Sequence, residues 1–283
     1  MGPILGDRRR TPEDATIKTP AHHYADHLGP VYTWMVGDTD AALSRGAAEL
    51  DALPLPTKVG GTAVDLGAGF GLHTLPLARR GFSVVAMDTC DSLLQELEAR
   101  KESLPIHAVN ADLSAFREHV GNPIDVILCM GDTLTHLPSL SSVESLFADV
   151  AASLSHGGLF VATFRDYVST PLQGDGRFIL VRSDEGRILT CFLEYADTIV
   201  TVHDLLHQRE GGSWRLRVSS YSKLRLSPQW VVERLSYLGL SVLRDAAPGG
   251  MIRITARKPE SAAATGSPTG PGAAVAAGTG ADP

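Results

Sequence analysis

The stretch at residues 64–71, VDLGAGFG, restricts the fold more than any other part of the sequence. An apolar segment ends in an acid, and glycines then occupy every second position. Because glycine tolerates positive φ and has no Cβ, such a turn lets a ligand lie directly against the backbone. A strand that enters a helix through this turn points backbone N–H groups at the ligand. The spacing is G-x-G-x-G, with Leu72 where the dinucleotide pattern has its third glycine, so it weighs against a nicotinamide dinucleotide.

Short apolar runs alternate with helical patterns around this turn. The runs lie at 61–66, 83–87, 124–130 and 158–164. Between the last two, residues 140–154 place apolar side chains at the three- and four-residue spacing of one helical face. Near-continuous apolar strands that alternate with helices predict a parallel sheet covered on both faces. Ligands of such sheets bind beyond the carboxyl ends of the strands.

The pattern changes after residue 170. Residues 171–226 contain successive strand-like runs separated by short turns, which predicts an antiparallel insert. Ser227, Pro228 and Gly239 then bound a helix as its N-cap, its first residue and its stop. A hairpin follows this helix, and a helical segment at 21–53 precedes the sheet.

Composition argues against several kinds of partner. The chain of 283 residues carries a formal net charge of -7, whereas proteins that bind nucleic-acid phosphates are usually basic. No apolar run approaches the roughly 18 residues of a membrane span, and the N-terminus has no signal-peptide pattern. The three cysteines lack CxxC spacing, which predicts reduced thiols and a cytoplasmic location. We therefore expect no nucleic-acid and no membrane partner.

Histidines four residues apart occur twice, as His23 with His27 and as His203 with His207. Bare spacing without a carboxylate partner is a weak indication of a metal site. We expect no metal.

Three acidic residues follow consecutive predicted strands. Asp65 precedes Gly67 by two residues, and Asp88 follows Gly67 by 21 residues at the end of the second run. An acid at about this distance holds a ribose diol in nucleotide-binding folds. Asp112, in the segment NADL, comes directly after a short third run, where it can accept a hydrogen bond from an exocyclic amine. Since the ends of parallel strands meet at one edge of a sheet, the three acids indicate one ligand site.

Four stretches together resemble the class I S-adenosylmethionine-dependent methyltransferases: VDLGAGFGLHTLPLARRGFSVVAMDTCDSLL, NADL, IDVILCMGDTLTHL and LSHGGLFVATF. The resemblance covers about residues 60–165, in order and at family spacing. It is specific for the fold and the cofactor, but not for the substrate. It implies that the cofactor is S-adenosylmethionine.

The resemblance also implies where the cofactor lies. The glycine turn and Asp65 would lie beside its methionine part, and Asp88 would hold the ribose hydroxyls. Asp112 and Leu113 would flank the adenine. The implied cofactor-binding residues are Asp65, Gly67, Ala68, Gly69, Gly71, Asp88, Thr89, Asp112, Leu113, Met130 and Gly131, the last two as the inner wall.

We therefore expect an α/β fold: a Rossmann-like, seven-stranded, mostly parallel sheet with helices on both faces, an N-terminal helical lid and an antiparallel β insert. The methyltransferase domain would span residues 21–258, with the lid at 21–53 and the insert at 171–226. Residues 1–20 are interpreted as a loose lead. Residues 259–283 are mostly small and cannot bury enough surface to offset their ordering entropy, which predicts a disordered tail.

The sequence disfavours nucleic-acid acceptors. The family's branches that methylate amino groups of nucleic acids have an Asn/Asp-Pro-Pro-aromatic stretch after the fourth strand, where this chain has Gly131-Asp132-Thr133-Leu134. Cys129 lies within a strand and lacks the neighbouring proline of the cytosine-C5 branch. The expected reaction is methyl transfer to N or O of a small-molecule acceptor, in specialised metabolism.

Candidates for catalysis follow the fourth and fifth strands. Asp132 could orient or deprotonate the acceptor, or cap the helix that follows. His136 could be a general base or a structural residue. Arg165 could grip a carboxylate or pair with Asp166. The catalytic candidates are Asp132, His136 and Tyr167, and Arg165 is a candidate for substrate binding.

The N-terminal stretch HHYADHLGPVYTWMVGD, residues 22–38, is dense in rings. As a lid over the cofactor mouth it would supply Tyr24, Tyr32 and Trp34 as further substrate-binding candidates; the alternative is a helix that only packs on the core. The insert could form the other wall, and its pocket candidates are Glu194, Tyr195, His203 and Tyr221. An edge of the insert could pair two subunits in a homodimer.

Three alternatives remain open at this point. A methyltransferase-like cyclase would convert S-adenosylmethionine to azetidine-2-carboxylate and methylthioadenosine, which needs little acceptor space. A non-catalytic protein could bind the cofactor only. A nicotinamide oxidoreductase is disfavoured by the glycine spacing.

Overall fold

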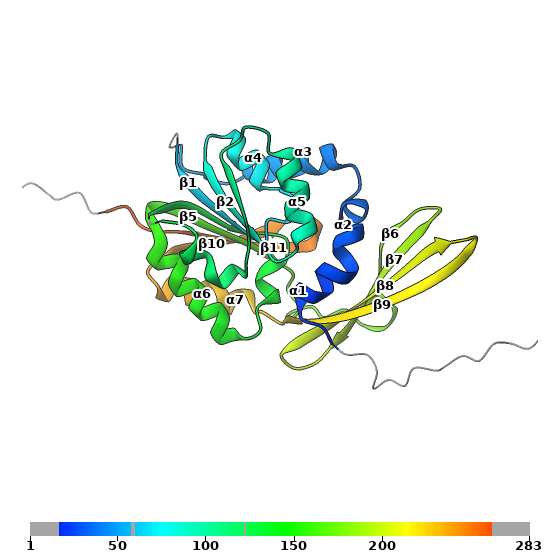
Figure 1. The fold of residues 1–283 in the computed structure, drawn as a ribbon. Helices are drawn as coiled ribbons and strands as arrows, with labels where there is room; N and C mark the ends of the chain where they lie inside the picture. The colour runs from blue at the N-terminus through cyan, green and yellow to red at the C-terminus, as the bar shows by residue number, and fades with distance from the viewer. Residues whose placement is uncertain (1–16, 58–59, 122, 262–283) are drawn as a thin grey trace, which may run out of the picture.

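The computed structural model describes residues 17–57, 60–121 and 123–261. A seven-stranded sheet with the order β10-β11-β5-β4-β1-β2-β3 forms the body of the protein (Figure 1). Its strands are β1 (Thr62–Leu66), β2 (Ser83–Asp88), β3 (Ile106–Asn110), β4 (Ile124–Cys129), β5 (Leu154–Phe164), β10 (Ser241–Ala247) and β11 (Met251–Arg257). The first five strands are parallel, and β11 runs antiparallel between β5 and β10. The predicted Rossmann-like fold class is confirmed.

Helices cover both faces of this sheet. One face packs on α3 (Thr39–Asp51), α4 (Thr74–Arg79) and α5 (Asp91–Arg100), and the other on α6 (Leu140–Ser153), α7 (Pro228–Tyr237) and the 3₁₀ helix η3 (Leu113–Glu118). Successive residues of β1 alternate between the two cores, Ala63 in the first and Val64 in the second, because strand side chains point to opposite faces in turn. Ser227 caps α7 as expected, accepting a hydrogen bond from the Trp230 N–H.

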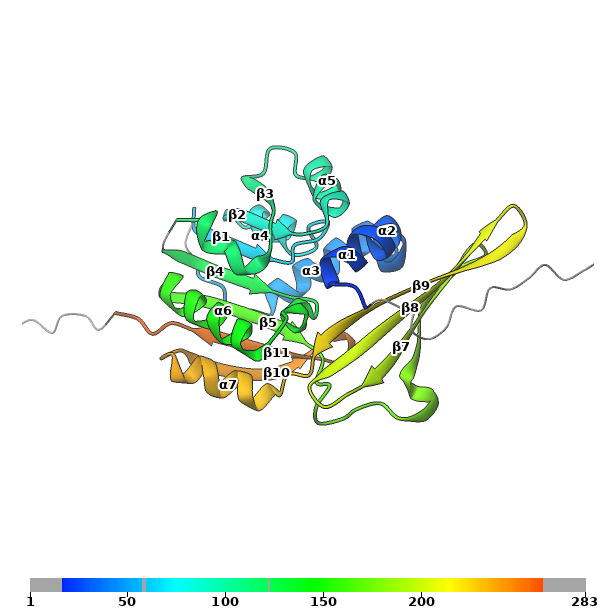
Figure 2. The ribbon, with the colours of Figure 1, turned by 60° about the horizontal axis from the view of Figure 1, so that its bottom comes forward.

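The predicted antiparallel insert forms a separate four-stranded sheet with the order β6-β7-β8-β9. Its strands are β6 (Phe178–Ser183), β7 (Arg187–Tyr195), β8 (Ile199–Glu210) and β9 (Ser213–Leu224), preceded by the 3₁₀ helix η5 (Gly174–Arg177). The sheet projects away from the seven-stranded body, as Figure 2 shows. In the sequence this sheet is inserted between β5 and α7, and in space it joins the body at the edge where the parallel strands end.

The N-terminal segment fills the angle between the body and the insert (Figure 2). It consists of α1 (Pro20–His23), a π-helical turn η2 (Tyr24–Leu28) and α2 (Gly29–Val36). Lys18 already pairs with the insert, since its backbone N–H donates to the Ser220 carbonyl over 2.8 Å. Residues 1–16 of the expected lead and 262–283 of the expected tail lie outside the described residues. None of the described helices is both long enough and apolar enough to cross a membrane.

Candidate active site

The glycine turn after β1 is fixed against the end of β2. The N–H groups of Gly67 and Ala68 both donate to the Met87 carbonyl, over 2.8 and 2.9 Å. Gly67 has φ +82°, and a Cβ there would lie 2.5 Å from Thr133 of the segment after β4. A side chain at position 67 would therefore be strained and would collide. Gly71, at φ +97°, instead permits close packing of the turn on Leu97 of α5.

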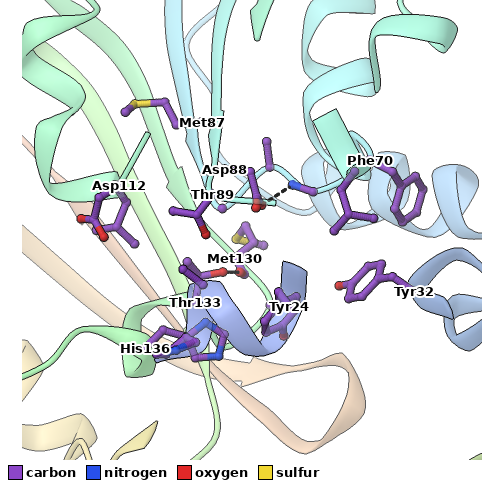
Figure 3. A pocket seen from close by; sticks show the side chains of 18 of the residues that line it. Tyr24, Tyr32, Phe70, Met87, Asp88, Thr89, Asp112, Met130, Thr133 and His136 are labelled. Carbon is purple, nitrogen blue, oxygen red and sulfur yellow. Dashed lines mark hydrogen bonds between the residues drawn. The ribbon is translucent and has the colours of Figure 1, made fainter. Parts of the chain in front are cut away.

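A cavity of about 350 Å³ opens over this turn, at the carboxyl ends of β1, β2 and β4 (Figure 3). Twelve of its lining residues were predicted from the sequence: Tyr24, Tyr32, Gly67, Ala68, Gly69, Asp88, Thr89, Asp112, Leu113, Met130, Gly131 and His136. Further lining residues include Thr19, Phe70, Met87 and Thr133. The N-terminal segment thus forms one wall of a cavity whose floor is the sheet edge.

The three acids have different environments. Asp88 lines the cavity, and its carboxylate accepts from the N–H groups of Gly69 and Cys90, each over 2.8 Å. Burial raises the pKa of Asp88. Asp112 also lines the cavity and caps η3 by accepting from the Ser114 N–H over 2.9 Å. Asp65 lies below the turn, where it accepts from the Thr74 hydroxyl over 2.6 Å, and it is not part of the lining.

Three rings close the end of the cavity away from the turn. Tyr24 of the N-terminal segment, His136 after β4 and Tyr221 of β9 lie with their ring centroids 5.6 to 6.2 Å apart. Burial, with a smaller contribution from Lys223, lowers the pKa of His136 to about 3, so its imidazole is neutral. Its Nε2 is buried and has no hydrogen-bond partner among the described residues. Burial also raises the pKa of Tyr24 and of Tyr221, which keeps both phenols protonated.

A buried ionic network lies behind this ring cluster. The Asp132 carboxylate accepts from Lys223 Nζ over 2.6 Å, from the Tyr167 hydroxyl over 3.0 Å and from the backbone N–H of Arg165 over 3.0 Å. Asp132 is 1% and Lys223 8% exposed. Burial opposes ionisation of Asp132, but the Lys223 ammonium outweighs it and holds the pKa of this carboxyl below its ordinary value. Asp132 occupies the N-cap position of the 3₁₀ helix η4 (Thr133–His136), yet its side chain makes no capping bond there.

The N-terminal segment is clamped to the insert by a second buried group. His23 Nε2 lies 2.8 Å from the Asp204 carboxylate, and His23 Nδ1 lies 2.9 Å from the Ser219 hydroxyl. The His23 ring, which is fully buried, stacks on Tyr221 at 4.2 Å. These contacts hold the backbone next to Tyr24 and orient Tyr221, so the insert and the N-terminal segment build the ring cluster jointly. The sequence pointed to His23 only through its spacing to His27, and it did not identify Asp204, Ser219 or Lys223.

Comparison with known proteins agrees with this geometry. Residues 63–158, which run from β1 into β5, match the family described as "Methyltransferase domain". This region therefore forms a methyltransferase domain of the class I S-adenosylmethionine-dependent type. Within this family the chain is similar to the glycine/sarcosine/dimethylglycine N-methyltransferase of Actinopolyspora halophila, with 31% identity over 38% of this chain and 20% of the relative. It is also similar to the glycine N-methyltransferase of Rattus norvegicus, with 26% identity over 72% of this chain and 75% of the relative.

The matches cover different shares of the relatives' own length. The first three curated relatives are matched over only 20%, 40% and 38% of their own length. Among solved structures, the CcbJ methyltransferase from Streptomyces caelestis superposes with a TM-score of 0.66 and 19% identity, covering 84% of this chain and 98% of that one. At this identity the likeness supports the fold alone, insert included.

The cofactor of this methyltransferase family is S-adenosylmethionine, and the cavity residues fit it. The backbone at Gly67 and Gly69 is free of side chains. The carboxylate of Asp88 receives two N–H bonds, and a carboxylate offers about four lone-pair sites, so two are left for the hydroxyls of a ribose. The lining between Met87 and Leu113 is mostly apolar, as an adenine ring requires.

Four predicted site residues of the methyltransferase lie outside this cavity, in addition to Asp65 and Gly71. Asp132 faces the ionic network. Arg165 and Tyr167 line a second cavity of about 930 Å³ between the insert and the β10–β11 hairpin. Arg165 pairs with Asp132, not with Asp166 as the alternative had it. Trp34 donates from its indole to Asp184 at the far end of the insert. Among the described residues, no group of three or more histidine, cysteine or acidic side chains could hold a metal.

Proposed function

We propose that this protein transfers the methyl group of S-adenosylmethionine to the nitrogen of a small-molecule amine. When bound, the cofactor supplies a methyl group on a positively charged sulfur: the acceptor nitrogen would form a bond to the methyl carbon, and the sulfur would leave in line as a neutral thioether. The roles of the site residues below belong to this proposal.

The cavity residues would position the cofactor in three places. Asp88 would accept from the ribose hydroxyls, and Asp112 with Leu113 would bracket the adenine. The turn at Gly67 and Gly69 would lie against the methionine part. From the methionine part through the ribose to the adenine, these contacts follow the ends of β1, β2 and β3 along one edge of the sheet, so one rigid element sets all three.

The preference for nitrogen rests on one observation: among the residues that the structure describes, neither Asp132 nor His136 at the ring cluster is free to remove a proton near neutral pH. Asp132 is held as a carboxylate by Lys223 and Tyr167. The pKa of His136, about 3, makes its imidazole too weak a base, because an effective general base has a pKa near the working pH. A hydroxyl acceptor would need such a base, whereas a neutral amine already carries its lone pair.

The charges around the ring cluster support the same conclusion. Burial opposes the charge of Lys223, but Asp132 outweighs it and raises the pKa of this ammonium. The Lys223 ammonium lies 5.6 Å from the Tyr221 ring. A fixed positive charge at this place disfavours a protonated amine beside it and so favours the nucleophilic form. The rings of Tyr24 and Tyr32, 6.0 Å apart on the N-terminal segment, would cover the reacting atoms and exclude water.

The activities of the similar proteins bear on the choice of acceptor. Both relatives described above are N-methyltransferases, for glycine in one case and for glycine, sarcosine and dimethylglycine in the other. We propose a small amine of this general kind for the present chain, with the lid of residues 21–53 and the insert of residues 171–226 as its walls, and we place the reaction in specialised metabolism.

The test is a product analysis by mass spectrometry. Purified protein is incubated with S-adenosylmethionine and a panel of amines, each paired with its hydroxy analogue, such as glycine with glycolate. We expect S-adenosylhomocysteine and an N-methylated product in equal amounts from at least one amine, and neither from the paired alcohol. Methylation of the alcohols alone would refute the preference for nitrogen.

A second candidate is the cyclase, and the size of the cavity favours it. At about 350 Å³ the cavity is at the small end for a ligand site and leaves little room for a second molecule. The same incubation without any acceptor separates the two. Methylthioadenosine together with azetidine-2-carboxylate would show the cyclase, whereas intact S-adenosylmethionine would exclude it. A protein that binds the cofactor and changes it in no incubation would support the non-catalytic reading.

A further inference from the structure

The insert sheet has two apolar faces, and the described residues cover only one of them. Along β8, Val202, Asp204 and Leu206 are buried, while the intervening residues are half-buried. The buried set faces the N-terminal segment, where Leu206 packs with Leu28 and Val31. In Figure 2, α1 and α2 lie on this inner side of the sheet.

The outer face is defined by the strand register. Val218 of β9 pairs with Leu205 of β8, which pairs with Thr190 of β7, which pairs with Leu180 of β6. Because paired residues point to the same side of a sheet, these four side chains form one row across it. The row on one side holds Phe178, Phe192, His203 and Ser220, and the row on the other holds Ser183, Ile188, His207 and Leu216. Trp214 lies at the tip.

Side chains of this outer face are strongly exposed. Phe178 is 55%, Leu180 62%, Trp214 47%, Leu216 51% and Val218 53% exposed. Aromatic side chains bury on the order of 150–250 Å² when covered and aliphatic ones less, so half-exposure of these five leaves roughly 400 Å² of apolar surface. The half-buried Phe192 and Leu205 on the same face add to it. One partner of a standard interface contributes about 800 Å², somewhat over half of it apolar. The outer face therefore offers what one side of a stable interface requires.

We propose that two copies of this chain pack face to face through the outer faces of their insert sheets. A two-fold axis places the same patch on both sides of the interface, so the patch must be compatible with itself. The centre of this face meets that condition, since its central row carries leucine, threonine and valine, and the flanking rows add phenylalanine, isoleucine and leucine beside two histidines and two serines. Sheets stacked in this way lie about 10 Å apart, with strand directions within about 30° of each other.

The central row carries no charged side chain. Two arginines lie on the same face outside that row: the Arg177 guanidinium lies 4.9 Å from the centre of the Phe192 ring, and Arg209 pairs with Trp214. Glu194 pairs with His203 over 3.1 Å toward the body. On β9, Arg217 points to the other face, where it donates to the Asp26 carbonyl of the N-terminal segment. No like charges would therefore meet at the centre of the two-fold interface. The proposal names a face of the insert, not the edge strand that the sequence suggested.

The oligomeric state of the full chain tests this proposal. We expect a molar mass near twice the 30.1 kDa of one chain by light scattering coupled to size exclusion, at tens of micromolar protein. The double substitution Leu216→Glu and Val218→Glu should give the monomer mass. Leu243→Glu is the matched control, because Leu243 is a 65% exposed leucine on β10 outside the insert. It should leave the dimer intact.

Two results would overturn the proposal: a wild-type monomer under these conditions, or a dimer that survives the double substitution. Thermal unfolding and binding of S-adenosylhomocysteine, measured on the same variants, guard against misfolding. Both should stay close to wild type, because the substituted side chains lie on the opposite face from the N-terminal segment. The proposed methyl transfer is therefore tested separately, and its failure would not alter the measured mass.

Discussion

Replacing Asp88 by alanine should weaken cofactor binding by a predictable amount. The carboxylate accepts two backbone N–H groups over 2.8 Å, and its remaining lone pairs are those assigned to the ribose. A hydrogen bond to a charged group has a net worth of about 1.5–3 kcal/mol, and water replaces part of it. We therefore expect a loss of about 1–3 kcal/mol, which is about a 5- to 150-fold rise in the dissociation constant of S-adenosylhomocysteine.

Isothermal titration calorimetry measures this constant directly, and two variants make the result specific. Asp88→Asn keeps one accepting oxygen and should fall between wild type and Asp88→Ala. Thr74→Val removes the hydroxyl that donates to Asp65 below the same turn, without touching the cavity, and reports on any general loosening of the turn. If Asp88→Ala weakens binding no more than Thr74→Val does, Asp88 does not hold the ribose.

Three further predictions concern the buried charges. Lys223→Met should lower the free energy of unfolding, measured in urea, by about 3–5 kcal/mol, because it leaves Asp132 without its buried partner. The control Arg234→Met breaks an ion pair whose two side chains are about half-exposed, and it should cost less than about 1 kcal/mol. Equal losses would contradict the role of the buried network. The unfolding free energy should fall as pH drops from about 6.5 toward 4. In the folded protein the pKa values of His27 and His136 are about 4 and about 3, so the unfolded chain binds more protons in this pH range. His27→Phe should make the unfolding free energy less dependent on pH, as measured by thermal melts at several pH values. In turnover assays His136→Phe should leave the shape of the pH–rate profile unchanged, and loss of one limb would show that the imidazole titrates during catalysis.

The sequence predicted that the glycine turn, Asp88 and Asp112 gather around one cavity, because each position depends on local sequence. The glycine turn, Asp88 and Asp112 each stand directly at the end of a strand, so the strand pattern alone placed them at one edge. The order of the parallel strands then brought them to one cavity. Gly71 and Asp65 were predicted for the same reason, but Gly71 packs on α5 and Asp65 bonds to Thr74. The position of a residue at a strand end does not determine which way it faces.

The ring cluster and the ionic network behind it were harder to predict from the sequence, because their contacts join distant parts of the chain. Asp132 was identified, but its partner Lys223 lies 91 positions away, and no spacing rule connects them. A signal was present nonetheless. Lys223 stands two residues after Tyr221, and Asp204 stands between Val202 and Leu206, so each places a charge on the buried side of an alternating strand. Such a charge requires a partner, although the pattern does not name it.

The clamp at His23 also sets the order in which the site can be completed. His23 meets Ser219 across 196 positions and Asp204 across 181, whereas the turn, β2 and β3 lie within about fifty residues of one another. During synthesis α1, the earliest helix that the structure describes, therefore lacks these partners until β9 has emerged, while the nucleotide-binding edge can already assemble. A segment made early is one of the last to be fixed in place.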